Sequence, residues 1–290
     1  MNDAPVTTLR IAIGDYRHTL PLKRGEIASP SLKLDFVDIK PMHKAFKSMV
    51  REHAFDVSEM ALVTFLQAKI YNKGLSLLPA PMLARFQHGT ILFNAERGKL
   101  STSELPGRRI GVRSYSQTTG AWLRGILQND YRVDLGRVQW VTFEDGHVAE
   151  YRDPAGVTRA RPDQDMTKML IEGEIDAAIY GADLPKDPRL QSVIPDPDVA
   201  GRAWYGKYGL VPVNHMVVVT DSLVRAHPKA VAELYRLLEA GKKAAGLPAA
   251  GEIDTTPFGK QANRRCLELL ISYALQQGLI SRRLDVDELW

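Results

Sequence analysis

Short runs of apolar, β-favouring residues alternate along the chain with segments in which apolar residues recur at helical spacing. Residues 9–13 form a first run that ends at Gly14, and residues 32–39 alternate between apolar and polar positions as a half-buried strand does. Residues 41–52 follow, with Pro41 at the first position and apolar residues at helical spacing. This alternation of strand and helix predicts an α/β protein with largely parallel sheets.

The elements farther along the chain follow the same pattern. We expect strands within residues 75–83, 89–94, 104–112, 138–143, 176–181 and 214–220. We expect helices within residues 61–74, 116–131, 165–174, 227–245 and 263–275. Residues 183–198 are rich in Pro and Asp, which predicts surface loops around one short strand. The pattern restarts after Gly98, and this restart indicates a second domain.

Composition and charge limit the classes of protein that remain. The chain has 290 residues, of which 44% are hydrophobic and 25% charged, as is usual for a globular protein of one or two domains. Its 38 Lys and Arg residues are nearly balanced by 34 Asp and Glu residues and are scattered, so we expect no nucleic-acid partner. The one cysteine, Cys266, lies in a helical pattern and is expected to be a buried apolar side chain.

The sequence lacks the patterns of export and membrane insertion. Its first residues do not combine a basic segment with an apolar segment and a cleavage site. No apolar run approaches the ~18 residues that are needed to cross a bilayer. We therefore expect a cytoplasmic protein without a membrane partner.

Histidines gather in the loops that follow the predicted strands. Four of the seven histidines lie there, at positions His18, His88, His147 and His215. Ligands of open α/β sheets bind at the carboxyl ends of the strands, so these imidazoles are candidates for handling a proton or binding a ligand. The same loops contain three carboxylates that could orient an imidazole, namely Asp15, Glu59 and Glu144. For each of these side chains the alternative is an ordinary surface or turn residue.

A second group of polar residues predicts an anion-binding site. Arg85 and Arg113 each offer parallel N–H groups to a carboxylate, the alternative being a solvated surface arginine. The run "SYSQTTG" places hydroxyls and an amide directly before a helix, where free backbone N–H groups attract anions. The alternative there is helix capping by Thr118 or Thr119. The remaining candidates for substrate binding are Gln87, Tyr115, Gln117, Asn214 and His215.

Several stretches, taken in order, resemble one known fold. The stretches "FDVSEMALVTFLQA", "GRRIGVRSYSQTTG" and "EGEIDAAI" are similar to the type 2 periplasmic-binding-protein fold. This resemblance implies two α/β lobes joined by crossover strands, with a ligand cleft between them. Lobe 1 is expected to comprise residues 1–95 and 212–290, and lobe 2 to comprise residues 96–211.

The sequence also resembles a cytoplasmic branch of that fold, the 4,5-dihydroxyphthalate decarboxylase family. The stretches "IAIGDYRHT", "ARFQHG", "WVTFEDGHVAEYRDP" and "PVNHMVVV" carry this resemblance. Arg17 departs from the family pattern, in which proline is usual at that position. The resemblance implies decarboxylation of an aromatic dicarboxylate such as 4,5-dihydroxyphthalate, which gives protocatechuate in phthalate catabolism.

That reaction requires an acid that protonates the ring carbon and a group that handles the phenolic proton. We expect His18, His88 and His147 to handle protons, with a carboxylate from the same loops orienting the imidazole. The ring itself accepts the electrons, so no organic cofactor is expected, and neither a nucleotide-binding nor a cofactor-lysine motif is present. HExxH and CxxC spacings are absent, and a divalent metal stays open.

Two other functions stay open. One is a solute-binding protein that has the same fold, binds a small anion and performs no chemistry. The other is a cytoplasmic enzyme that acts on a different substrate, such as a pyrimidine precursor or another aromatic acid. The expected partner of an enzyme is a small-molecule aromatic carboxylate, and association of the chain into a homo-oligomer also stays open.

Overall fold

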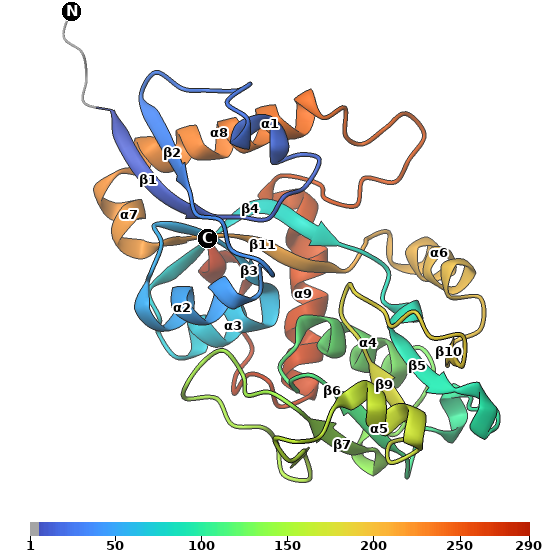
Figure 1. The fold of residues 1–290 in the computed structure, drawn as a ribbon. Coiled ribbons are helices and arrows are strands. Elements are labelled where there is room, and N and C mark those ends of the chain that lie inside the picture. Colours follow the sequence, from blue (N-terminus) through green and yellow to red (C-terminus); the bar gives the residue numbers. More distant parts are fainter. Residues whose placement is uncertain (1–5) are drawn as a thin grey trace, which may run out of the picture.

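Two β-sheets with helices packed against them form the two lobes of the molecule, which Figure 1 shows at upper left and lower right. The computed structural model describes residues 6–290. Residues 1–5, which belong to the N-terminal segment that lacks an export pattern, lie outside the described residues. The arrangement confirms the predicted α/β fold class. The lobe boundaries at residues 95 and 211 stay a prediction.

The first sheet has the strand order β2-β1-β3-β11-β4. Its strands are β1 (Thr7–Ala12), β2 (Leu32–Phe36), β3 (Val57–Ala61), β4 (Leu75–Ala84) and β11 (Val213–Thr220). The second sheet has the order β10-β5-β9-β6-β7-β8. Its strands are β5 (Ile91–Asn94), β6 (Arg109–Val112), β7 (Gln139–Thr142), β8 (Thr158–Arg159), β9 (Ala177–Ile179) and β10 (Leu190–Ser192).

Each sheet has a parallel interior and a strand that runs against it. In the first sheet β1 is parallel to β2 and β3, whereas β11 is antiparallel to β3 and β4. In the second sheet β6 is parallel to β7 and β9, whereas β5 is antiparallel to β9 and β10. Because β11 runs in reverse, its first residues lie beside the last residues of its neighbours: His215 is opposite Ala61, and Val213 is opposite Ala84.

Nine α-helices occur in the described part of the chain. They are α1 (Leu20–Lys23), α2 (Lys44–Glu52), α3 (Leu62–Ile70), α4 (Thr118–Asn129), α5 (Met166–Glu172), α6 (Pro197–Tyr208), α7 (Asp221–Ala226), α8 (Pro228–Ala244) and α9 (Lys260–Gln276). The predicted short strand in the loop-rich stretch is confirmed as β10. Helix α6 was not predicted, because its first residue, Pro197, ends a run of Pro and Asp that favours loops, although proline also suits the first turn of a helix.

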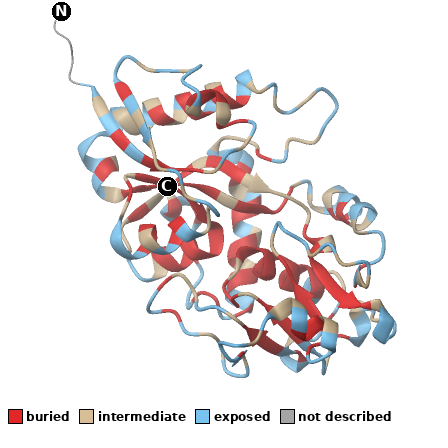
Figure 2. Ribbon diagram, viewed as in Figure 1, coloured by how far each residue is buried: buried red, intermediate tan, exposed pale blue. Residues whose placement is uncertain are grey.

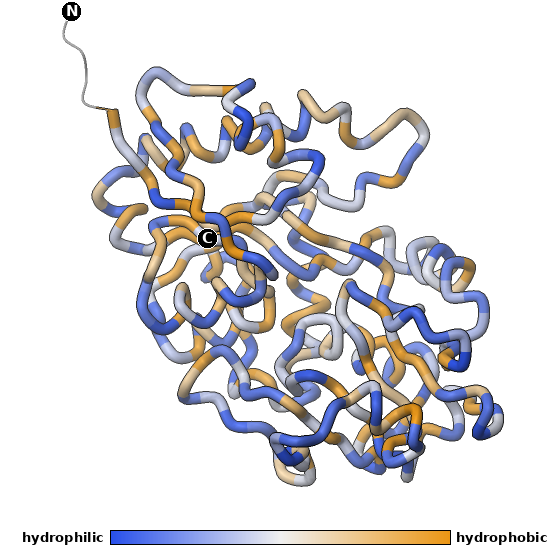
Figure 3. The backbone as a smooth tube through the Cα atoms, viewed as in Figure 1, coloured by the Kyte–Doolittle hydropathy of each residue, from blue (hydrophilic) through white to orange (hydrophobic). Residues whose placement is uncertain are grey.

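One continuous hydrophobic core links the two lobes. The buried residues follow the strands of both sheets and the helices against them (Figure 2), and the tube of Figure 3 is mainly hydrophobic along the same strands and hydrophilic in the outer loops. Helix α9 packs against α4, where the rings of Trp122 and Tyr273 meet edge to face with centroids 5.8 Å apart. A Cβ on Gly125 of α4 would lie 2.0 Å from Cδ2 of Tyr273, so this close approach requires glycine.

Two further expectations concern Cys266 and the membrane. Cys266 is buried and unpaired, as expected, and burial raises the pKa of its thiol to about 12, which leaves it unreactive at neutral pH. Among residues 6–290 no helix combines the length and apolar character that are needed to cross a membrane.

Candidate active site between the lobes

A cavity of about 570 Å³ lies between the two lobes, at the strand ends described below, and side chains from both lobes line it. The carboxyl ends of β6, β7 and β9 lie level with one another in the second sheet, since Val112 is opposite both Thr142 and Ile179. In the first sheet the ends of β3 and β4 meet the start of β11. The loops that leave these ends enclose the cavity, and the predicted ligand cleft is therefore present. Its volume suits a small organic ligand.

The cavity brings together most of the residues that the sequence indicated. The predicted residues that line it are Arg85, Arg113, Gln117, Thr118, Thr119, Glu144, His147, Asn214 and His215. They come from four segments that lie far apart in the sequence, and the two sheets place them around one space. The predicted residues that do not line it are Asp15, His18, Glu59, Gln87, His88 and Tyr115.

Two arginines provide the positive charge of the cavity. Nη2 of Arg85 donates to Oγ1 of Thr119 at 3.0 Å, and its buried Nε has no hydrogen-bond partner within residues 6–290. Burial lowers the pKa of Arg85. Nε of Arg113 lies 3.7 Å from the carboxylate of Glu144, which is half exposed to solvent. An incoming carboxylate would give these guanidinium groups the hydrogen bonds that they lack.

The first turn of α4 forms the floor between the arginines. Thr118 and Thr119 do not cap this helix, because the residue that precedes it is Gln117 and no side chain caps it. Instead Oγ1 of Thr118 accepts from the backbone N–H of Val63 at 3.0 Å, and Oγ1 of Thr119 accepts from Asn214 at 3.1 Å. The capping alternative for these threonines is thus wrong. Both side chains tie α4 to the first lobe, and its first backbone N–H groups stay available to an anion.

Three imidazoles lie in the same cavity. Nδ1 of His147 is 2.7 Å from Oγ1 of Thr64 on α3, so the contact crosses from the second lobe to the first. Burial, and then the nearby charge of Arg113, lower the pKa of His147 to about 3. His43 lies just before α2, and burial, followed by Arg113, also lowers its pKa. These two imidazoles are therefore neutral in the ligand-free protein.

The third imidazole, His215, rests on a fully buried carboxylate. Oε1 of Glu59 lies 2.6 Å from Nδ1 of His215 and 2.6 Å from the hydroxyl of Tyr16, and Oε2 accepts from the backbone N–H of Gly14 at 2.9 Å. Burial by itself would raise the pKa of Glu59, but the hydrogen bonds that it accepts from His215, Tyr16 and Gly14, together with the positive charge that His215 carries when protonated, lower it overall. Glu59 is therefore ionised and accepts hydrogen bonds only. We call these four residues the Glu59 network.

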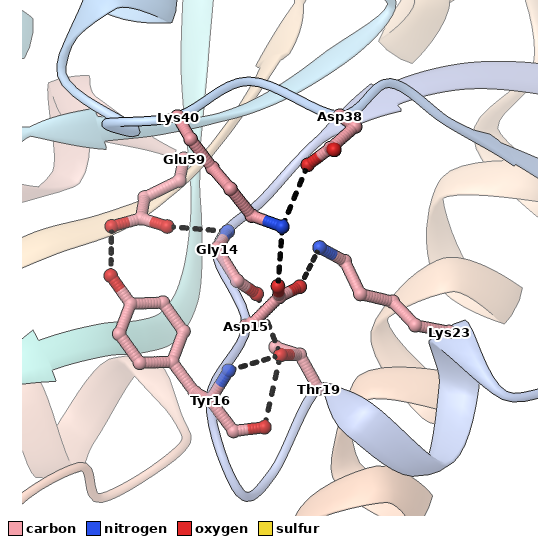
Figure 4. A network of polar contacts seen from close by, with 8 residues as sticks. All are labelled: Gly14, Asp15, Tyr16, Thr19, Lys23, Asp38, Lys40 and Glu59. Carbon is pink, nitrogen blue, oxygen red and sulfur yellow. Dashed lines mark hydrogen bonds and ion pairs between the residues drawn. The ribbon is translucent and has the colours of Figure 1, made fainter.

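Figure 4 shows the part of the Glu59 network that follows β1, together with its neighbours. The carboxylate of Asp15 points away from Glu59 and lies 2.5 Å from Lys23 and 3.5 Å from Lys40. Asp15 is thus engaged in an outer ion-pair cluster and orients no imidazole of the cavity. A Cβ on Gly14 would lie 2.7 Å from the ring of Tyr16 and 3.1 Å from Glu59, so glycine permits the ring to reach the carboxylate.

Two predicted histidines lie in packed surroundings outside the cavity. His88 is 1% exposed, faces the rings of Tyr131 and Trp204, and burial lowers its pKa. His18 is 5% exposed and stacks on the Tyr16 ring, and burial lowers its pKa to about 4. The loop positions of these histidines were identified correctly, but the packing of later segments turns both rings away from the ligand space.

Two predicted binding residues support the cavity from behind. Gln87 is fully buried and donates to Oδ1 of Asn214 at 2.8 Å, which fixes the amide that holds Thr119. Tyr115 is buried beneath the guanidinium of Arg124, which lies 3.9 Å from its ring centroid. Neither side chain lines the space where a ligand would lie.

The cavity also contains residues that the sequence analysis did not identify as site residues. They include Tyr16, His43, Phe46, Thr64, Tyr180 and Asp183. His43 and Tyr16 follow β2 and β1, so the rule that selected the other histidines could have found them. Phe46 has helical spacing and was expected only in the core, yet its ring meets both His147 and His215 edge to face. Among residues 6–290 no three or more His, Cys, Asp or Glu side chains are grouped so that they could hold a metal ion.

Comparison with solved structures establishes the fold. The chain has the periplasmic-binding-protein fold, and it superposes on the alkanesulfonate-binding protein SsuA of Xanthomonas axonopodis pv. citri, solved bound to MOPS, with a TM-score of 0.63 at 14% identity over 99% of each chain. The SsuA protein of Escherichia coli gives 0.62 at 12% identity over 99% of this chain and 97% of that one. The desulfurization enzyme DszB gives 0.50 at 13% identity over 97% and 95%.

Comparison with curated sequences confirms the more particular resemblance. The chain is 27% identical to the 4,5-dihydroxyphthalate decarboxylase of Comamonas testosteroni over 97% of this chain and 96% of that protein. It is 28% identical to the protein of the same name from Pseudomonas putida over 68% and 81%. No protein-family model matches the chain.

Proposed function

We propose that this protein is a carboxy-lyase that removes one carboxylate from an aromatic dicarboxylate of the 4,5-dihydroxyphthalate type. The observation that carries the proposal is the convergence of two guanidinium groups and three imidazoles on one cavity between the lobes. The curated relatives named for this activity, one of which aligns along 97% of this chain, support the substrate class.

Recognition of the substrate is assigned to the cationic part of the cavity. Two adjacent carboxylates on a benzene ring present four oxygens in one region, and Arg85, Arg113 and the first turn of α4 present N–H donors there. The structural neighbour SsuA was solved with a sulfonate ligand, which is also an organic anion. The edge-on ring of Phe46 offers an apolar contact to the face of a benzene ring.

The chemistry requires one net proton for each molecule of CO₂. A hydroxyl para to the departing carboxylate loses its proton, and its electrons pass through the ring to the carbon that bears the carboxylate. That carbon takes a proton and becomes tetrahedral, the bond to the carboxylate breaks, and its electron pair restores the aromatic ring as CO₂ leaves. The phenolate then recovers its proton. The ring itself accepts and returns the electrons, and we propose that no cofactor takes part.

We assign protonation of the carbon to His147. The hydrogen bond between its Nδ1 and Thr64 leaves Nε2 available to the ligand. In the empty site burial, and then the charge of Arg113, disfavour the imidazolium. The negative charge of a bound dicarboxylate beside Arg113 favours the imidazolium, and we propose that His147 takes up the proton that it donates when substrate is bound.

The direct test is incubation of the purified protein with 4,5-dihydroxyphthalate while CO₂ and protocatechuate are measured. We expect one of each per substrate consumed. The variant His147→Gln is expected to lose about 10²-fold or more in kcat while it retains binding of phthalate, which lacks the hydroxyls. His227→Gln is the matched control, because His227 is exposed, does not line the cavity and lies at the start of α8. Wild-type protein that releases no CO₂ overturns the proposal.

The fold favours a second candidate, a binding protein for a small organic anion, because the solved neighbours include sulfonate-binding proteins. This function predicts tight binding of an aromatic carboxylate and recovery of the ligand unchanged. The cytoplasmic location belongs to the enzyme proposal, and fractionation of cells that express the full-length gene tests it.

A further inference from the structure

We propose that Nε2 of His215 is the base that takes the phenolic proton, and that Glu59 and Tyr16 are positioning residues that hold this imidazole in the required tautomer. The inference rests on the proposed decarboxylation and assigns a step that the resemblance leaves without a residue. His215 was expected to bind substrate, and Glu59 was expected to orient an imidazole without a particular partner.

The tautomer of His215 follows from the hydrogen bonds of the Glu59 network. An ionised carboxylate only accepts hydrogen bonds, so Nδ1 of His215, 2.6 Å away, must carry the proton that it shares with Glu59. In the neutral imidazole, Nε2 then has a free lone pair. No hydrogen bond to Nε2 occurs among residues 6–290, and the His215 ring lines the cavity. A basic nitrogen therefore faces the space assigned to the substrate.

The position of the ring is fixed on several sides. Backbone pairing with Ala61 sets where His215 leaves β11, and the edge-to-face contact with Phe46, at a centroid distance of 5.0 Å, limits rotation of the imidazole. Glu59 is itself immobilised, because its side chain is 0% exposed and it accepts from Tyr16 and from Gly14. A hydroxyl placed at Nε2 therefore meets a base of fixed direction.

The negative charge of Glu59 suits a base that takes up a proton for one step of the reaction and then returns it. When His215 takes the phenolic proton, the imidazolium that forms lies against the carboxylate of Glu59, which stabilises it without a change in the other hydrogen bonds. The proton returns to the phenolate when the aromatic ring is restored, so the base ends each cycle as it began. No other reactant is consumed in this step.

Other ionisable groups also face His215 and must be considered in any pH profile. They are Glu59 from β3, Tyr16 from the loop after β1, His43 from the segment before α2, and His147 and Arg113 from the second lobe. His147 acts on the carbon rather than on the hydroxyl in the proposed function, so its substitution should lower kcat without removal of the base.

A structural role for the same contacts is the alternative. The bond between Glu59 and His215 joins the neighbouring strands β3 and β11, and the alternative is that it serves only to hold these two strands together. In that case substitutions in the network would lower stability and activity together and would leave the pH dependence of kcat/KM unchanged. The direction in which the acid limb moves therefore distinguishes the two roles.

The experiment compares kcat, KM and the pH profile of kcat/KM with 4,5-dihydroxyphthalate for His215→Gln, Glu59→Gln, Tyr16→Phe and the control His227→Gln. We expect His215→Gln to lose 10²-fold or more in kcat and to bind phthalate as the wild type does. Glu59→Gln removes the charge that favours the imidazolium, so the acid limb should move to lower pH by about one unit.

Tyr16→Phe should move the acid limb in the opposite direction. The variant removes a donor that competes for Oε1 of Glu59, and the freed carboxylate then favours the imidazolium of His215 more strongly. If the wild type turns over substrate and His215→Gln has an unchanged kcat, the inference about His215 is wrong and the proposed function still stands. An acid limb that stays in place in both network variants also overturns it, whereas a wild type without turnover overturns the proposed function and this inference together.

Discussion

Replacement of Arg85 by methionine should affect stability and binding in different ways. In the ligand-free protein Arg85 is partly buried, makes one side-chain hydrogen bond, to Thr119, and leaves its buried Nε without a partner within the described residues. A buried unpaired donor costs about 1–3 kcal/mol, so its removal offsets the loss of the bond to Thr119, which still receives a hydrogen bond from Asn214. We therefore expect the free energy of unfolding of Arg85→Met to stay within about 1 kcal/mol of the wild-type value.

Ligand binding should weaken strongly in the same variant. Two charge-assisted hydrogen bonds to a carboxylate contribute about 1.5 kcal/mol each at the lower end of the usual range, or about 3 kcal/mol together. Since about 1.4 kcal/mol corresponds to a tenfold change in Kd, binding of phthalate should weaken about 100-fold. At a phthalate concentration of about 100 times the wild-type Kd, the ligand stabilises the wild type by about 2.7 kcal/mol but the variant by only about 0.4 kcal/mol.

The assay is thermal unfolding of both proteins with and without phthalate, supported by calorimetric titration. The reasoning predicts nearly equal Tm values without ligand and a ligand-induced shift that almost disappears in Arg85→Met. A variant that melts much lower than the wild type but keeps the full shift would show that Arg85 holds the fold together and takes no part in anion binding.

Three further predictions address the packing and the chemistry around the site. Burial lowers the pKa of His18 to about 4, whereas an unfolded histidine titrates near ~6.5, so the unfolded state binds the proton first and stability falls as pH drops through this window. The loss from His18 should reach about 2 kcal/mol at pH 5, and His18→Leu should melt with a weaker pH dependence than the wild type; equal slopes from pH 7 to pH 5 would contradict this. Gly125→Ala should lower the free energy of unfolding by about 1–3 kcal/mol in denaturant titrations, because the added Cβ meets the ring of Tyr273, and an unchanged midpoint would refute the close contact of α4 with α9. Dialysis against a chelator should leave decarboxylation at full rate, and activity that disappears and returns with a divalent cation would show that a metal is required.

The order of the elements could be predicted because it depends on local patterns. Short apolar runs selected β1, β4 and β11, alternation of apolar and polar residues selected β2, and helical spacing selected α2, α4 and α8. Helix α6 was missed because its helical pattern is weak and its first turn follows a run of turn-forming residues. Local signals there favour a loop, and contacts with the turn at residues 86–89, such as the close approach of Gly201 to the ring of Phe86, help to hold the helix in place.

The candidate site was predicted at the level of loops but not at the level of side-chain direction. His88 and His147 both follow strands and look equivalent in the sequence. In the structure Trp204 of α6 packs against the ring of His88, whereas the loop that carries His147 crosses to α3 and presents its ring to Thr64. The segment that packs against each imidazole decides whether that imidazole reaches the cavity. Trp204 and Thr64 each lie more than 80 residues from the histidine that they contact, so the sequence near the histidines does not show the outcome.

The sequence by itself determined the α/β class, the order of most strands and helices, and the loops in which chemistry could occur, because each depends on residues close together in the chain. Only the tertiary structure decided which of those loops share one cavity and which groups become partners. Glu59 and His215 are 156 positions apart, and they meet because β11 runs antiparallel beside β3 and places His215 opposite Ala61. Strand register and the packing of one lobe on the other are long-range properties, so no local pattern records them.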